Sequence, residues 1–147
     1  MSTITELTPF GTYTGTTGDF NALRIFFPTS VAPLPDDGAK QRVANAKNIL
    51  AAVAQAASLQ QANAAAQLAQ VNLGDPTAIS LSQATLVKYF EAGRVLAAVP
   101  VYETTLDNWL ANHDIYRGLV AVGKLTDAPP FPEPTADLAA YLPGLQF

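Results

Sequence analysis

The chain has 147 residues, of which 49% are apolar and only 14% charged, whereas a typical domain carries about 25% charged residues. Eight basic and twelve acidic residues give a net charge of -4, which argues against nucleic acid or an anionic membrane surface as a partner, because both need a basic face. There is no cysteine, so disulfides, thiolate nucleophiles and cysteine-based metal sites are excluded.

The first 36 residues are rich in Thr, Gly and Pro. Residues 12–18 are typical of a loop or of a weak strand and turn, and they lack the Gly-Lys-Ser/Thr of a phosphate loop. The N-terminus has neither the basic nor the apolar segment of a signal peptide. We expect residues 1–18 to form a flexible Thr/Gly-rich arm and residues 19–147 to form a single helical domain.

The short apolar stretch Leu23–Phe27 predicts a strand or a helical turn that fills part of the core and ends at Pro28. Asp36 and Asp37 then provide candidate N-caps for a long helix. From Ala39 to about Asn72 there is neither proline nor glycine, and Ala and Gln, which favour helix, dominate the composition.

This long helix carries apolar residues at every seventh position, which predicts a packing face of mostly small side chains. A break near Ser58, giving two shorter helices, is equally compatible with the pattern. No charged residue lies between Lys47 and Asp75, but the amide side chains in this gap are costly in lipid and favour a helix buried among other helices over a membrane span. The repeat consists of Val43, Leu50, Ala57, Ala64 and Val71, with Val53 and Leu68 nearby.

A second helix is predicted from Ser80 to Val99, after a restart at Asp75 and Pro76, and Pro100 is expected to end it. Its apolar residues recur at helical spacing and indicate one packing face. That face consists of Leu86, Phe90, Gly93 and Ala97, with Val87, Val95 and Val99 beside it.

Three further segments complete the predicted architecture. Thr104 or Thr105 caps a third helix, which Gly118 and Gly123 end or divide. Prolines between residues 129 and 134 predict an extended linker, and Thr135 caps a short helix that ends at Leu142. The elements together predict an all-α fold with long Ala-rich helices, an extended N-terminal arm and a Pro-rich C-terminal segment.

The sequence contains no pattern typical of an enzyme or a metal site. His113 is the one histidine, and its neighbour Asp114 would not face it on a helix, so we interpret it as a capping or surface residue. No nucleophile-elbow motif is present, and scattered acidic residues do not make a metal site. The aromatic residues are spread along the chain, which is typical of a core but is also compatible with a cavity for a large flat ligand.

Several segments, taken in order, resemble the peridinin–chlorophyll a-binding proteins of dinoflagellates. Asp19-Phe20-Asn21 is similar to the family's Asp-Trp-Asn, and residues 44–49 (Ala-Asn-Ala-Lys-Asn-Ile) are similar to its Ala-Ile-Asp-Lys-Met-Ile. The best match is residues 93–100, Gly-Arg-Val-Leu-Ala-Ala-Val-Pro, against Gly-Arg-Val-Ile-Ala-Ser-Val-Pro. The resemblance covers residues 19–142, is weakest after Pro100, and rests on order and spacing rather than on one motif.

The resemblance implies a single helical repeat that forms an open shell around chlorophyll and carotenoid, pairs as a homodimer like the family's short forms, and resides in the thylakoid lumen. The family has His-His after its Ala-rich helix, and the first of these holds the chlorophyll magnesium through a water. This chain departs from that pattern with Gln67 and Leu68, and the Gln67 amide oxygen is able to accept a hydrogen bond from such a water. The ligand-binding residues expected on this basis are Gln67, Leu68, Ala64, Phe90, Gly93 and Trp109.

Two non-enzymatic functions are therefore open. The first is binding of apolar pigments, chlorophyll or carotenoid, by a soluble light-harvesting protein. The second is a structural subunit of a large assembly such as a virion, with no small ligand, because low charge and an Ala/Gln helix suit a surface covered by other proteins. Both predict further copies or other proteins as partners, and neither predicts nucleic acid or a transmembrane segment.

Overall fold

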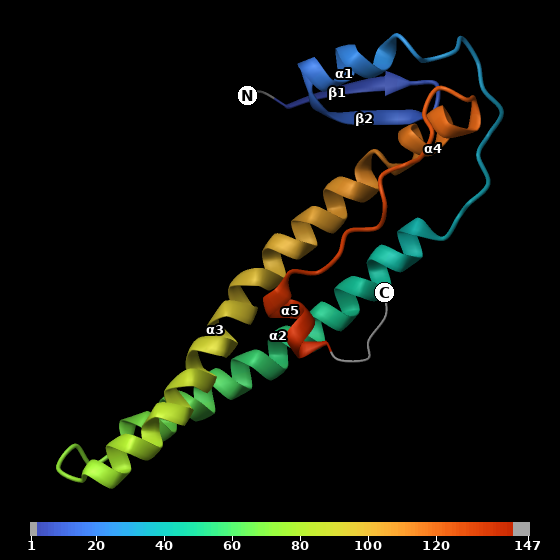
Figure 1. Ribbon diagram of the computed structural model, residues 1–147. Helices are drawn as coiled ribbons and strands as arrows, with labels where there is room; N and C mark the ends of the chain where they lie inside the picture. The colour runs from blue at the N-terminus through green and yellow to red at the C-terminus, as the bar shows by residue number, and fades with distance from the viewer. Residues whose placement is uncertain (1–2, 143–147) are drawn as a thin grey trace. The chain divides into compact units, whose positions relative to one another are not determined.

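The computed structural model describes residues 3–142, apart from the side chain of Leu81 (Figure 1). Within this range the chain forms two strands followed by five helices. The prediction of an all-α fold is therefore wrong, because an antiparallel sheet of two strands precedes the helices. Helix is nevertheless the main structure from Thr17 onward.

The sheet lies in the segment that was expected to be a flexible arm. β1 (Thr3–Thr8) and β2 (Gly11–Thr16) pair along their whole length. Threonine occupies alternate positions of β2, and its branched side chain favours the pleated surface of a strand. The expectation of an extended arm over residues 1–18 is thus wrong for the strands, while Met1 and Ser2 lie outside the described residues.

Side-chain hydrogen bonds stabilise the hairpin turn and one edge of the sheet. The Thr8 hydroxyl donates to the carbonyl of Gly11 at 2.6 Å and accepts the N–H of Phe10 at 3.2 Å. At the outer edge of β2, the Asn112 side chain donates to the carbonyl of Thr14 at 2.8 Å and accepts its N–H at 3.0 Å. The amide therefore replaces a neighbouring strand at this position.

Two of the helix caps that the sequence predicts are present, whereas Thr135 precedes the short C-terminal helix without making a side-chain cap hydrogen bond. Asp37 accepts the N–H of Ala39 at 3.1 Å at the start of α2, and Asp75 accepts the N–H of Thr77 at 3.0 Å at the start of α3. The helices are α1 (Thr17–Arg24), α2 (Ala39–Ala69), α3 (Pro76–Ala111), α4 (His113–Ala121) and α5 (Ala136–Tyr141).

Two interruptions that the sequence suggests do not occur. α2 passes through Ser58 without a break, and α3 passes through Pro100, which was expected to end a helix. Pro100 has no N–H to donate to the carbonyl of Leu96, a loss that costs about 3 kcal/mol in a helix interior. The buried residues Val99 and Tyr102 flank Pro100 on one face, so their packing favours continuation of the helix.

The chain divides into two compact units, which are described separately. Unit 1 comprises Met1–Val43 and Thr105–Pro132, and it holds the sheet, α1 and α4. Unit 2 comprises Ala44–Thr104 and Glu133–Phe147, and it holds most of α2 and α3 together with α5. The single domain expected over residues 19–147 stays a prediction.

Unit 1 has an aromatic core between the sheet and α4. Tyr13, Ile115 and Leu119 are buried at its centre. The predicted apolar plug, Leu23–Phe27, supplies three of the side chains packed against that centre. Gly118 of α4 lies directly under the ring of Phe10, where a Cβ atom would overlap that ring. The half-buried residues around the centre are Ile4, Phe10, Phe20, Leu23, Phe26, Phe27 and Leu125.

In unit 2, α2 and α3 run antiparallel along a narrow seam (Figure 1). Gln60 donates to the carbonyl of Lys88 at 2.9 Å, so the later part of α2 lies beside the earlier part of α3. Buried residues recur on both helices in steps of three and four, the spacing of a coiled-coil seam. They are Ala46, Leu50, Val53, Ala57 and Ala64 on α2, and Ala92, Val95, Val99 and Tyr102 on α3.

The seam confirms the predicted packing face of α2, but on α3 it confirms only Val95 and Val99, which were predicted to lie beside the main face. Leu50, Ala57 and Ala64 are buried as expected. On α3, however, Leu86 is 41% exposed and Phe90 is 54% exposed, so the face predicted from these residues is not the one that packs on α2. α3 carries two apolar stripes at helical spacing, and the buried one contains the smaller side chain of Ala92, which permits closer approach of α2.

Candidate functional site

A group of charged side chains in unit 1 surrounds His113, the first residue of α4. Its Nε2 donates to Oδ2 of Asp37 at 2.7 Å, and its ring stacks on Trp109 with centroids 4.3 Å apart. His113 is only 9% exposed, so its interpretation as a capping or surface residue is wrong. No local pattern in the sequence indicates this pair, because 76 positions separate the two residues.

Arg117, one turn further along α4, binds the same loop. Its guanidinium donates to the carbonyl of Pro35 and, at 3.1 Å, to the carboxylate of Asp114. It also lies 3.7 Å from the carboxylate of Asp37. The acidic neighbour of His113 in the sequence is thus a partner of Arg117 rather than of the imidazole.

The cluster lowers the pKa of Asp37. The main cause is the hydrogen bond from His113, and the backbone N–H of Ala39 and the positive charge of Arg117 act in the same direction, while partial burial opposes them. The Nδ1 atom of His113 is buried and has no hydrogen-bond partner among the described residues. A catalytic imidazole needs one nitrogen that faces a substrate or nucleophile. This imidazole instead links α4 to the loop before α2 through its hydrogen bond to Asp37.

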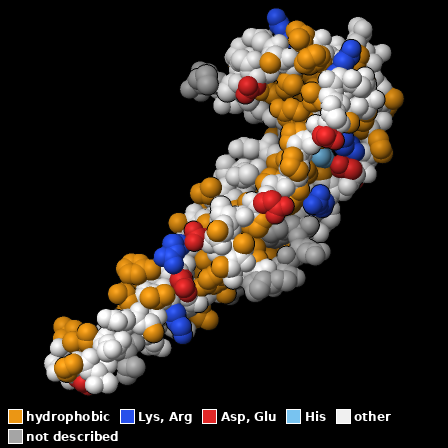
Figure 2. All heavy atoms as spheres, viewed as in Figure 1, with side chains coloured by type: hydrophobic (Ala, Val, Ile, Leu, Met, Phe, Trp, Pro, Cys, Tyr) orange, Lys and Arg blue, Asp and Glu red, His pale blue; other side chains and the backbone are white. Residues whose placement is uncertain are grey.

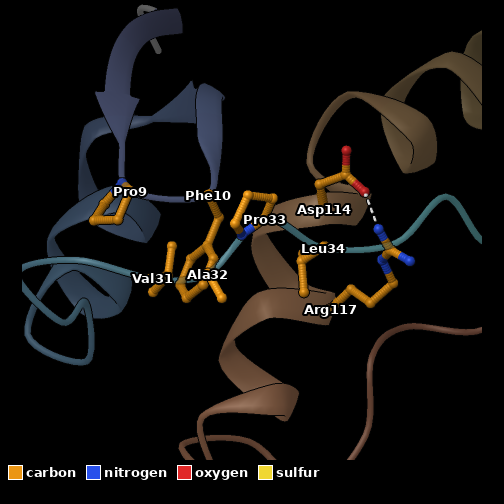
Figure 3. Close-up of a pocket in the computed structure, with 8 residues that line it drawn as sticks. All are labelled: Pro9, Phe10, Val31, Ala32, Pro33, Leu34, Asp114 and Arg117. Atoms are coloured by element: carbon orange, nitrogen blue, oxygen red, sulfur yellow. Dashed lines mark hydrogen bonds and ion pairs between the residues drawn. The ribbon is translucent and has the colours of Figure 1, made fainter.

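A hollow of about 330 Å³ adjoins the cluster (Figure 3). Pro9 and Phe10 from the hairpin turn, residues 31–34 of the following coil, and Asp114 and Arg117 of α4 line it. Six of the eight lining residues have apolar side chains. The two charged side chains are paired with each other, so they offer few free polar groups to orient a ligand.

Trp109, one of the expected ligand residues, binds the Pro-rich segment of unit 1. Its indole N–H donates to the carbonyl of Pro129 at 3.0 Å, and its ring meets Phe131 edge-on at 5.1 Å. The guanidinium of Arg42 lies 4.2 Å from the centre of the Phe131 ring. Trp109 therefore anchors this segment, and together with His113 it also lines a hollow of about 340 Å³.

The other five expected ligand residues lie in unit 2. Ala64 is buried in the seam, whereas Gln67 is exposed and Leu68 is half-buried. Gln67 and Leu68 line a hollow of about 360 Å³ near the end of α2. The Gln67 amide oxygen accepts a long hydrogen bond, 3.4 Å, from the hydroxyl of Thr85.

Phe90 and Gly93 lie apart from that hollow, Phe90 on an exposed side of α3 and Gly93 next to Gln61 of α2. Phe90 is more than half exposed and meets Tyr89 edge-on at 5.6 Å. A Cβ atom at Gly93 would lie 3.3 Å from the amide nitrogen of Gln61, so the glycine makes room for that side chain. Neither residue lines the hollow beside Gln67.

Phe90 belongs to an apolar stripe that we name the outer face of α3. Its members recur in helical steps over about five turns, and the larger ones are partly exposed, from 39% for Ile79 to 54% for Phe90. Figure 2 shows hydrophobic side chains along unit 2, with acidic and basic side chains among them. Arg94 borders the face and lies 3.7 Å from Asp137 of α5. The outer face consists of Ile79, Leu86, Phe90 and Ala97.

Residues 3–142, the part of the chain that the structure describes, lack two kinds of feature. No group of three or more His, Asp or Glu side chains is arranged to hold a metal ion there. No helix in the same range has both the length and the hydropathy needed to cross a bilayer.

Comparison of the chain with protein-family models, with curated proteins and with solved structures found no match.

Proposed function

We propose that this protein is a non-enzymatic structural subunit of a larger protein assembly, held there through the outer face of α3. The observation that carries the proposal is the second apolar stripe on α3, which is left exposed although it has the spacing of a packing face. Scattered exposed apolar residues are normal on any protein, but a contiguous stripe indicates an interaction surface.

The composition supports the same function. Charged residues are depleted at the centres of protein interfaces, and this chain carries only 14% of them. The polar cluster around His113 fits a scaffold as well, since its side chains bind one another and hold the loop before α2. A scaffold needs rigid elements that present a constant face to neighbouring subunits, and a long helix pair provides one.

Size measurement on the protein from its native source tests this proposal. We expect it to sediment or elute as part of a complex much larger than the 15.5 kDa of one chain. The double variant Leu86→Glu, Phe90→Glu should be released from the complex, because two buried carboxylates in the interface would be unpaired. A free chain of 15.5 kDa in the wild type would contradict the proposal.

Pigment binding stays a prediction, with less support from the geometry. The expected ligand residues of unit 2 are divided between the seam, one hollow and the outer face, and the hollow of about 360 Å³ is at the small end of ligand pockets. A tetrapyrrole with its hydrocarbon tail is larger than the ligands that such hollows hold. A visible absorption band that copurifies with the chain and is lost in Gln67→Leu would favour pigment binding over the structural function.

A further inference from the structure

We propose that unit 1 binds a small neutral saccharide in the hollow beside Trp109, which we name the Trp109 hollow. Its wall comes from the end of α3, the start of α4 and two prolines of the Pro-rich segment. The volume of about 340 Å³ is at the small end of ligand pockets, so the hollow suits a ligand the size of a monosaccharide or disaccharide. The inference goes beyond the proposed function, because it does not use the outer face of α3.

The charges around the Trp109 hollow select a neutral ligand. Among the described residues that line it there is no Lys, Arg, Asp or Glu. Its one imidazole, that of His113, is already bonded to Asp37 through Nε2 at 2.7 Å. A charged ligand would lose hydration in the hollow without gaining an opposite charge, which makes its binding unfavourable.

Two polar groups of the wall are free to bind hydroxyl groups. The Asn108 amide and the Tyr116 hydroxyl form no hydrogen bond with other described residues, whereas the Asn112 amide is occupied by the backbone of Thr14. A carboxamide has both donors and an acceptor, and a phenol both donates and accepts. Ligand hydroxyls, which also donate and accept, match both groups.

His113 adds a third polar group to this wall. Its side chain is only 10% exposed, and its Nδ1 is buried without a partner among the described residues. An unpaired buried nitrogen in a folded protein calls for a bound water or ligand. A sugar hydroxyl, directly or through a water, satisfies Nδ1 in either tautomer because the hydroxyl is both donor and acceptor.

The apolar part of the wall favours a saturated ring over a flat aromatic one. His113 stacks on Trp109 with centroids 4.3 Å apart, and Phe131 also meets the indole, so the indole faces are already in contact with other rings. Pro129 and Pro132 contribute saturated rings to the wall. A sugar ring brings C–H groups to such a surface and hydroxyls to the polar groups, and ligand pockets commonly combine the two.

Trp109 is the only tryptophan of the chain, so its fluorescence reports on this hollow alone. Purified full-length protein is titrated with glucose, galactose, mannose, N-acetylglucosamine and maltose. At least one of them should change the emission in a saturable way, with a dissociation constant that is roughly millimolar, since the hollow is small and few groups contact the sugar. No change with any of these sugars up to roughly 100 mM would overturn the inference.

Three variants locate the binding site. Asn108→Ala and Tyr116→Phe each remove one hydrogen-bonding group and should raise the dissociation constant roughly three- to tenfold. Asn63→Ala, at an exposed helical position in unit 2, is the matched control and should leave the constant unchanged. Asn108 is exposed as well, so its replacement should preserve the fold, which circular dichroism checks. Equal constants in all four proteins would show that the sugar binds elsewhere and overturn the inference.

Saturation-transfer NMR tests the class of ligand without relying on fluorescence. Irradiation of the protein should transfer saturation to the C–H groups of the bound neutral sugar. Charged relatives, such as glucuronate for glucose and glucosamine for N-acetylglucosamine, should bind several-fold more weakly. Equal binding of the charged forms, or binding of adenine in place of every sugar, would show that the ligand class is wrong.

The two proposals are tested separately. Leu86→Glu, Phe90→Glu, which should release the chain from its complex, changes residues outside the Trp109 hollow and should keep the sugar affinity of the wild type. Sugar binding by a chain that is free in its native source would contradict only the proposed function. Absence of sugar binding by a chain that is part of a large complex would contradict only the saccharide site.

Discussion

Gly118 is the residue at which local preference and tertiary packing disagree most clearly. Glycine in a helix interior is less favourable than alanine by about 1 kcal/mol, yet α4 has glycine at this position. The ring of Phe10 occupies the space that a Cβ atom would need. The close approach of the hairpin turn to α4 therefore explains the glycine.

We expect Gly118→Ala to lower the free energy of unfolding by roughly 1–3 kcal/mol, because the displaced ring outweighs the gain in helix propensity. Gly18→Ala is the matched control, since Gly18 is also helical and nothing lies within 4 Å of its missing Cβ. Gly18→Ala should raise the free energy of unfolding by about 0.5–1 kcal/mol. Urea titration of the three proteins measures both effects, and a stabilising Gly118→Ala would contradict the packing.

Asp37 is the residue whose ionisation the cluster controls. Its pKa is lowered from 3.8 in the folded chain, chiefly by the hydrogen bond from His113. A lowered folded pKa contributes stability above pH 3.8 that is lost as the pH falls through the folded value. The carboxylate is 38% exposed, so solvent screens part of this contribution.

We therefore expect Asp37→Asn to be less stable than the wild type at neutral pH and the difference to shrink as the pH falls below 3.8. Urea titrations at several pH values give the comparison. Asp127→Asn, which removes an exposed carboxylate outside the cluster, should follow the wild type in parallel at every pH. A difference that stays constant or grows in acid would show that the Asp37 charge does not stabilise the fold.

At the scale of elements, proline has two different effects on α3. Pro76 occupies the first helical position, where no N–H is needed for the helix, and Pro100 lies deep inside it. The helix tolerates the hydrogen bond that is missing at Pro100, because α3 packs along α2 in unit 2 on both sides of this residue. Packing of a long amphipathic face thus decides the length of the helix, and local propensity does not.

Pro100→Ala should restore the missing hydrogen bond to Leu96 and raise the free energy of unfolding by roughly 1–3 kcal/mol. Pro76→Ala should be neutral or slightly destabilising, since it only loosens the first turn. Thermal and urea unfolding followed by far-ultraviolet circular dichroism compares the two variants. Destabilisation by Pro100→Ala would mean that the seam needs the bend or rigidity of proline at this position.

At the scale of the whole molecule, binding within an assembly should couple to stability. A partner that binds the folded chain and not the unfolded one stabilises it by mass action, so the midpoint of thermal unfolding should be higher in the native complex than in the free chain. In Phe90→Ser the two midpoints should lie closer together, because the contact through the outer face of α3 is weakened. Calorimetry of the complex and of the free chain measures this, and an equal difference in both proteins would count against the proposed interface.

The sequence by itself determined the helical character of most of the chain and the face on which α2 packs. Both rest on local signals: proline and glycine are missing over α2, and apolar residues such as Leu50 and Ala57 recur at a constant interval. The caps at Asp37 and Asp75 were also predictable, because an N-cap bond spans only two or three residues.

Only the tertiary structure decided which stripe of α3 is buried, because both stripes have helical spacing and the choice depends on their fit to α2. It also decided the candidate sites. The pair of His113 and Asp37 joins residues far apart in the chain, and no periodic pattern encodes such a contact. The outer face of α3 was visible in the sequence as a face, but its exposure follows from the three-dimensional packing of unit 2.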